Sequence, residues 1–171
     1  AIIMVSNIQL IQKFGRHGQV MFTIQDKILL ADEYKVLDYI YRDSDGKAFA
    51  IDTVTNPLFN NTTWAFLFKW YGNEKYETMP VWLGYPQVDP FVYGKDIAFS
   101  DAALDKGSLL YVIYEPPEGI PDHYYSAYPR YEDTRSHLIE KKQIGTFWVE
   151  KRSLTGENML FSRDALVDIM E

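Results

Sequence analysis

Three short stretches of the chain carry the start and stop signals of a helix. In each, a serine precedes the apolar positions and can accept a hydrogen bond from a free N–H group of the first turn. These serines are Ser6, Ser100 and Ser162, and apolar residues flank each of them as a hydrophobic staple requires. Gly15 and Gly107 follow the first two segments, where glycine favours the left-handed conformation that ends a helix. The pattern predicts short capped helices over about 7–14, 101–106 and 163–171.

Between these segments, apolar and polar residues tend to alternate, which is typical of strands. Asp45 and Gly46 stand between two β-rich runs, 34–41 and 47–54, and this dipeptide favours the turn of an antiparallel hairpin. The stretch 62–71 is apolar at odd and even positions alike, so it predicts a long central strand buried on both faces. Further strands are expected at 19–24, 109–114 and 144–152. Runs of strands with helices near the ends predict an α+β fold with a mainly antiparallel β-sheet.

No flexible polar linker divides the chain, and we expect a single domain over residues 1–171. The segment 115–131 stands out because it combines four prolines with closely spaced tyrosines. Proline lacks an N–H donor, so this segment cannot serve as a central strand. We expect a Tyr/Pro-rich excursion at about 115–131 that projects from the domain body.

Four tyrosines of this excursion form the candidate interface: Tyr124, Tyr125, Tyr128 and Tyr131. Leaving such rings in water forgoes burial stabilisation on the order of 1.5–3 kcal/mol for each large side chain. We therefore expect another chain to bury them. The alternative is that the segment folds back as a lid over its own core.

The composition narrows the classes of partner. The formal net charge of −7 argues against nucleic acid as a direct specific partner, because phosphate binding concentrates Lys and Arg. The absence of cysteine excludes disulfides, thiolate zinc sites and cysteine nucleophiles. No apolar run approaches the ~18 residues of a membrane span, and no membrane partner is expected. Aromatic residues make up 16% of the chain, which suits protein interfaces as well as sheet packing.

No pattern indicates a catalytic, cofactor or metal site. His17, His123 and His137 lack the short spacing of a zinc motif, and no serine lies in a G-x-S-x-G sequence. Residues 43–46 superficially resemble a calcium loop, but its first and last ligand positions do not match. Six basic residues interleaved with acids are interpreted as a salt-bridged, solvated face. They are Arg130, Arg135, Lys141, Lys142, Lys151 and Arg152.

Residues 8–16, Ile-Gln-Leu-Ile-Gln-Lys-Phe-Gly-Arg, followed by the predicted strand at 19–24, resemble the opening of some tailed-bacteriophage neck proteins. Those head-closure or head–tail connector proteins often begin with a short helix ending in Lys-(Phe/Tyr)-Gly and then a strand. The resemblance implies a small β-rich subunit that is built into a ring and performs no catalysis.

We therefore expect a non-enzymatic structural or assembly protein of a bacteriophage virion, in the neck or tail, assembled in the host cytoplasm. Its expected partners are proteins, in a ring-forming homo-oligomer or a hetero-assembly, and no cofactor is expected. Two alternatives stay open. One is a cytoplasmic, acidic partner- or ligand-binding module of the immunity or inhibitor type. The other is a hydrolase that uses His123 or His137 as a general base.

Overall fold

The computed structural model describes residues 28–85, 99–117, 120, 122–156 and 160–170. Its centre is a five-stranded sheet with the strand order β2-β1-β3-β5-β4. The strands are β1 (Phe49–Val54), β2 (Val81–Trp82), β3 (Leu109–Tyr114), β4 (Ser136–Ile144) and β5 (Phe147–Leu154). The predicted α+β class is confirmed. The sheet is mixed, because β1 runs parallel to β2 and β3 while β5 runs antiparallel to β3 and β4.

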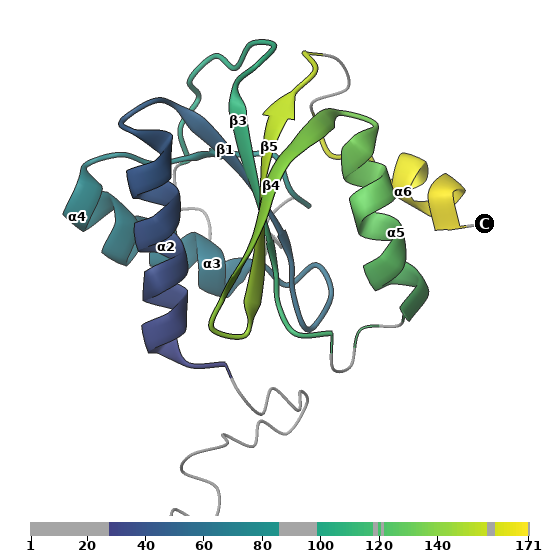
Figure 1. Cartoon of the computed structure of the whole chain (residues 1–171), viewed down its shortest axis with the longest axis horizontal. Coiled ribbons are helices and arrows are strands. Elements are labelled where there is room, and N and C mark those ends of the chain that lie inside the picture. Colours follow the sequence, from purple (N-terminus) through teal and green to yellow (C-terminus); the bar gives the residue numbers. More distant parts are fainter. Residues whose placement is uncertain (1–27, 86–98, 118–119, 121, 157–159, 171) are drawn as a thin grey trace, which may run out of the picture.

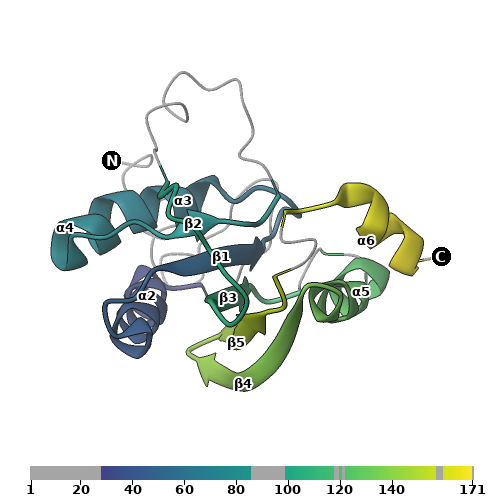
Figure 2. The ribbon, with the colours of Figure 1, turned by 90° about the horizontal axis from the view of Figure 1, so that it is seen from above.

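Helices cover both faces of the sheet (Figure 1). On one side lie α2 (Leu30–Ser44), α3 (Thr62–Leu67), the π-helical turn η1 (Phe68–Gly72) and α4 (Asn73–Tyr76). On the other side lie α5 (Asp122–Asp133) and α6 (Arg163–Met170). The view from above shows the sheet between these two helical layers, with β4 at its outer edge (Figure 2).

The pleat of the strands divides the core in two. Along β1, Phe49 and Ile51 belong to the cluster under α2 and α3, whereas Ala50 and Val54 belong to the cluster under α5 and α6. All six residues of β1 are buried, because other strands flank it on both edges and helices cover both faces. Successive side chains of a strand point to opposite faces, so one short strand supplies both clusters.

The predicted hairpin over 34–41 and 47–54 is wrong in its first half. Residues 30–44 form helix α2, and its buried positions recur at three- and four-residue intervals, as on one helical face. Asp45 and Gly46 follow with φ angles of 52° and 73° and end the helix. The left-handed conformations that suit Asp-Gly in a hairpin turn also suit a helix terminus, so the dipeptide fits both structures. The second half of the hairpin contains strand β1.

The predicted central strand at 62–71 is also wrong. This stretch forms α3 and most of η1, and it buries Trp64, Leu67 and Phe68 while Phe66 and Trp70 stay exposed. Its aromatic composition favours a strand, but tertiary packing outweighs such a weak preference. The segment joins the parallel strands β1 and β2, and a helical crossover is the usual connection between parallel neighbours.

Of the predicted helices, the C-terminal one is confirmed as α6, and the Ser162 hydroxyl accepts a hydrogen bond from the N–H group of Ala165 at 3.2 Å. The prediction at 101–106 is wrong, because these residues form an irregular segment and a turn. Ser100 accepts instead from Ala102, two residues on, as in a serine turn. The strands expected at 109–114 and 144–152 correspond to β3 and, shifted by two or three residues, to β5. The segments 7–14 and 19–24 lie outside the described residues.

Candidate functional site

The predicted Tyr/Pro excursion is largely helix α5, and this helix packs on the chain's own sheet. Tyr128 and Tyr131 are buried in the core, with exposed fractions of 0% and 2%, while Tyr124 and Tyr125 are half-buried. The projecting arm is therefore wrong for the two buried tyrosines. Tyr124, Tyr128 and Tyr131 follow the i, i+4, i+7 spacing of one helical face, a signal that the proline at 129 obscured. Contact of the two half-buried rings with another chain stays a prediction.

A fully buried ion cluster joins α5 to the sheet. The Arg135 guanidinium lies 2.5 Å from an Asp52 oxygen and 2.7 Å from a Glu132 oxygen, and all three side chains have no exposed surface. The same guanidinium donates to the Leu83 carbonyl oxygen at 2.8 Å. Tyr128 donates its hydroxyl proton to Asp52 at 3.1 Å. The cluster thus joins β1, the residue after β2, helix α5 and the start of β4.

Burial governs the protonation of this cluster. Burial and the neighbouring Asp52 carboxylate raise the pKa of Glu132 to about 8, against the opposing effect of Arg135. One guanidinium thus faces two carboxyl groups, and a carboxyl group with a raised pKa can carry a proton near neutral pH. We infer a structural role for the cluster, because its side chains have no contact with solvent.

A second network contradicts the solvated face expected for the basic residues. Arg152 is only 1% exposed, and it donates to Glu150 at 2.5 Å and to Asp133. Lys141 lies 3.0 Å from the other Glu150 oxygen. The predicted salt bridges are present, but Arg135 and Arg152 lie inside the molecule. The alternation along β5 places the Arg152 side chain under α5, and its chain position alone did not show this.

Two buried glutamates meet where the start of α2 lies near the end of β3. Glu115 accepts hydrogen bonds from the Trp64 indole at 2.8 Å and from the Asn56 backbone at 2.7 Å. Glu33 is 7% exposed, and burial together with the nearby Glu115 charge raises its pKa to about 7. Glu33 is therefore favoured in its neutral form up to a higher pH than an exposed glutamate.

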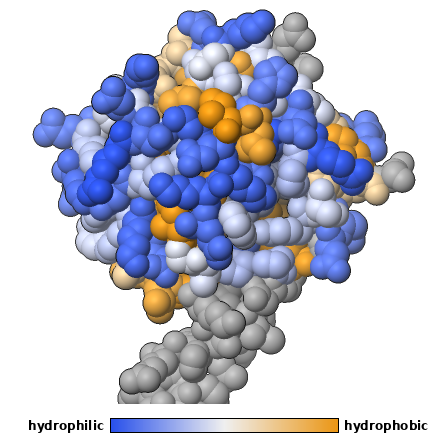
Figure 3. Space-filling view, in the orientation of Figure 1, coloured by the Kyte–Doolittle hydropathy of each residue, from blue (hydrophilic) through white to orange (hydrophobic). Residues whose placement is uncertain are grey.

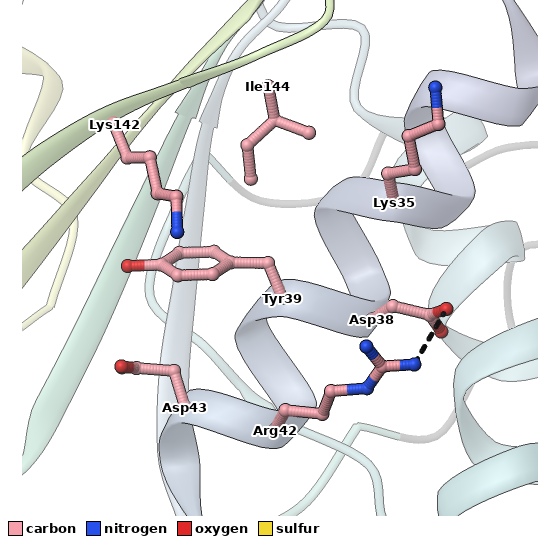
Figure 4. Close-up of a pocket in the computed structure, with 7 residues that line it drawn as sticks. All are labelled: Lys35, Asp38, Tyr39, Arg42, Asp43, Lys142 and Ile144. Carbon is pink, nitrogen blue, oxygen red and sulfur yellow. Dashed lines mark ion pairs between the residues drawn. The ribbon is translucent and has the colours of Figure 1, made fainter.

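A groove lies between α2 and the edge strand β4 (Figure 4). It has a volume of about 540 Å³ and is lined by Lys35, Asp38, Tyr39, Arg42, Asp43, Lys142 and Ile144. The Lys142 ammonium group lies over the face of the Tyr39 ring, 4.4 Å from its centre. A second hollow of about 610 Å³ begins at Asp43 and continues around the C-terminal end of α2. We call the two hollows together the α2/β4 groove.

Hydrogen bonds already engage Asp38 and Asp43, the two carboxylates that line the first hollow of this groove. Asp38 accepts from Tyr71, Tyr76 and Lys75 at 2.8–3.0 Å. Burial opposes ionisation of both carboxylates, but the hydrogen bonds outweigh it and lower the pKa of each. For Asp43 the donors are Lys151 and Tyr111. These carboxylates are anions held by several donors, and we infer that the basic side chains beside them determine what the groove can bind.

The surface also carries a pair of exposed aromatic side chains on α3 and η1. Phe66 and Trp70 are 52% and 49% exposed, and their rings stack with centres 5.8 Å apart. They lie four residues apart, across the junction of α3 and η1. Trp70 also lines a small hollow of about 280 Å³ with Tyr71, Glu74 and Lys75. We call Phe66 and Trp70 the aromatic pair.

The two described histidines lie at the surface. His123 and His137 are exposed on α5 and β4, and His17 lies outside the described residues. Within the described part of the chain, no group of three or more His, Asp or Glu side chains could hold a metal ion. Nor does any helix there combine the length and apolar character needed to cross a bilayer. The chain matches no protein-family model, no curated protein and no solved structure.

Replacing Arg135 by Met should lower the free energy of unfolding by about 3–5 kcal/mol, because it leaves buried carboxyl groups without their cationic partner. Urea unfolding followed by circular dichroism measures the change. The matched control is Lys35→Met, which removes an exposed ion pair with Asp32 and should cost less than about 1 kcal/mol. An Arg135→Met protein as stable as the control would contradict the structural role of the cluster.

Glu33 should make the protein less stable as the pH rises. Its pKa is raised from 4.5 to about 7 on folding, so its favourable contribution is complete below the lower value and lost as the pH passes the upper one. Glu33→Gln keeps a neutral side chain and should gain about 2–3 kcal/mol over the wild type between pH ~5 and pH ~8.5. Urea titrations at the two pH values measure this, and the exposed Glu74→Gln is the control. A stability difference that does not change with pH would contradict the prediction.

Proposed function

We propose that this chain is a non-enzymatic structural subunit that assembles through protein–protein contacts, as a component of a bacteriophage neck or tail. The observation that carries the proposal is the aromatic pair. Two large rings, each about half exposed, stand stacked on a helix whose opposite face is packed in the core. Trp and Tyr are enriched among the residues that dominate binding energy in protein interfaces.

The backbone under the aromatic pair favours binding without rearrangement. Trp64, Leu67 and Phe68, on the same helical segment, are fully or almost fully buried and anchor it to the sheet. The two exposed rings already stack on each other, so a partner need not order them. A binding surface that is ordered in advance loses less entropy on association, and this increases affinity.

Glu132 in the buried cluster and Asp38 and Asp43 in the α2/β4 groove do not have the properties of a general base. Glu132 has a strongly raised pKa but is enclosed and paired with Arg135. In the open groove, the acids Asp38 and Asp43 have lowered pKa values and are engaged by several donors. A general base works best with a pKa near the operating pH and with access to the substrate. Asp38 and Asp43 do not combine these two properties.

The resemblance to phage neck proteins rests on residues 8–24, outside the described part of the chain, and the location in a virion belongs to the proposal. A ring requires a heterologous contact, in which the aromatic pair of one copy meets a different surface of the next. In a hetero-assembly, the aromatic pair would instead contact a different protein. The isolated subunit would then be monomeric.

The aromatic pair should be required for assembly and dispensable for folding. We expect the wild-type chain to form a closed oligomer as its concentration rises in sedimentation velocity, and Phe66→Ser/Trp70→Ser to stay monomeric with an unchanged thermal midpoint. Leu160→Ser, which removes a 77% exposed leucine elsewhere, is the matched control and should assemble normally. If the wild type and the double variant show the same association state at every concentration, the ring-forming assembly through this pair is contradicted.

A further inference from the structure

Strand β4 offers a long unpaired edge. It has nine residues and pairs with β5 on one side, while no strand of the described chain lies on its other side. Seven consecutive residues, 137–143, are exposed. The outer N–H and C=O groups of an edge strand can pair with the backbone of another chain. Figure 3 shows apolar side chains over β4 within a mainly hydrophilic face.

The α2/β4 groove runs beside this edge and is lined by β4 itself. Lys142 and Ile144 line the first of its two hollows, and Ile139 lines the second, at the C-terminal end of α2. From the opposite side, α2 contributes Lys35 and Arg42 to the first hollow. Side chains of a strand added along β4 would alternate between the two faces of the sheet. Those on the face of α2 would enter the groove.

The groove is positive on an otherwise acidic protein. Six basic side chains and three acidic ones line it, an excess of three positive charges, whereas the whole chain carries −7. Lys35 and Lys151 pair with Asp32 and Asp43, and Arg42 lies 3.6 Å from Asp38. The other three basic side chains form no ion pair with a described carboxylate. They are Lys47, Lys106 and Lys142.

We propose that β4 and the α2/β4 groove bind an extended acidic segment of a partner protein, which adds to the sheet as a sixth strand. Backbone hydrogen bonds to β4 supply affinity, and acidic side chains at alternate positions reach Lys142 and Arg42. This inference rests on the proposed function, since it assigns one protein contact of the same subunit. It uses a different surface from the aromatic pair.

The edge itself argues for an acidic protein segment over the other occupants. Lys141 and Lys142 are adjacent on β4, and the strand carries an irregularity between Leu138 and Glu140. Edge lysines and bulges discourage indiscriminate pairing, including pairing between two copies. An acidic strand turns the same lysines into attractive partners. Nucleic acid would use the groove charge but could not use the backbone edge.

The test uses nine-residue peptides, matching the length of β4, that alternate Thr with Glu, Gln or Lys. Binding is followed by changes in the amide resonances of β4 in nuclear magnetic resonance spectra of the full chain. We expect the Glu peptide to bind at least tenfold more tightly than the Gln and Lys peptides. Two further Glu peptides carry methyl groups on the backbone nitrogens of either the odd or the even residues. One pattern should abolish binding and the other should leave it intact, because alternate N–H groups face β4.

Charge-reversal variants of the protein test whether the basic side chains of the groove bind the acidic peptide. Lys142→Glu and, separately, Arg42→Glu should each weaken the Glu peptide at least tenfold with an unchanged thermal midpoint. Lys69→Glu makes the same charge change on η1, outside the groove, and should weaken it less than threefold. A dodecamer of thymidine is titrated alongside the peptides.

Three outcomes would overturn the inference: no preference for the Glu peptide, binding that is indifferent to both methylation patterns, or tighter binding of the thymidine dodecamer. The last would assign the groove to nucleic acid. In each case, sedimentation of the Lys142→Glu protein separates this failure from that of the proposed function. Assembly through the aromatic pair should be unaffected by the substitution.

Discussion

The position of helix α5 depends on one buried guanidinium. Arg135 meets carboxyl groups from two directions, Asp52 on β1 and Glu132 on α5, and none of the three side chains has any exposed surface. Gly84 passes so close that a Cβ atom there would clash with an Asp52 oxygen, so the chain after β2 is fitted to this carboxylate. Buried charges are costly to desolvate, and a misplaced α5 would leave them unpaired. The cluster therefore favours one placement of α5 on the sheet.

This constraint also explains what the sequence could and could not predict. The cap at Ser162 is a contact between near neighbours in the chain, and it was predictable. Asp45 and Gly46 were identified correctly as a turn, but their φ angles fit a hairpin and a helix end equally well. Asp52 and Arg135 lie 83 positions apart, and nothing in either local pattern joins them. Two of the four strand pairs are parallel, and such pairing is likewise set by distant segments.

The candidate surfaces likewise depend on how segments far apart in the chain pack together, which local sequence patterns do not show. Proline excludes a central strand over 115–131, but a helix packed on the sheet is another solution for the same tyrosines. The aromatic pair was hidden because 62–71 was interpreted as a strand, in which Phe66 and Trp70 would not have been exposed together. The groove could not be found at all without the fold, since α2 and β4 are nearly a hundred residues apart.

The molecule separates its charges in a way that suits a binding subunit. Inside, each strongly buried guanidinium has carboxylate partners, and these contacts hold α5, β4 and β5 together. Outside, three lysines of the α2/β4 groove form no ion pair with a described carboxylate, and α3 and η1 carry the stacked rings of the aromatic pair. A rigid interior lets both surfaces keep their shape before a partner arrives, which lowers the entropic cost of association.

The dependence of the fold on the Arg135 cluster is tested most directly by native-state hydrogen exchange. If α5 cannot leave the sheet without exposing unpaired buried charges, the backbone amides around Ala127 and Tyr128 should exchange only with global unfolding. Their free energy of opening would then equal that of the amides of β1 and β3. Exchange of the α5 amides through a local opening several kcal/mol cheaper than that of β1, with β1 still protected, would contradict the account.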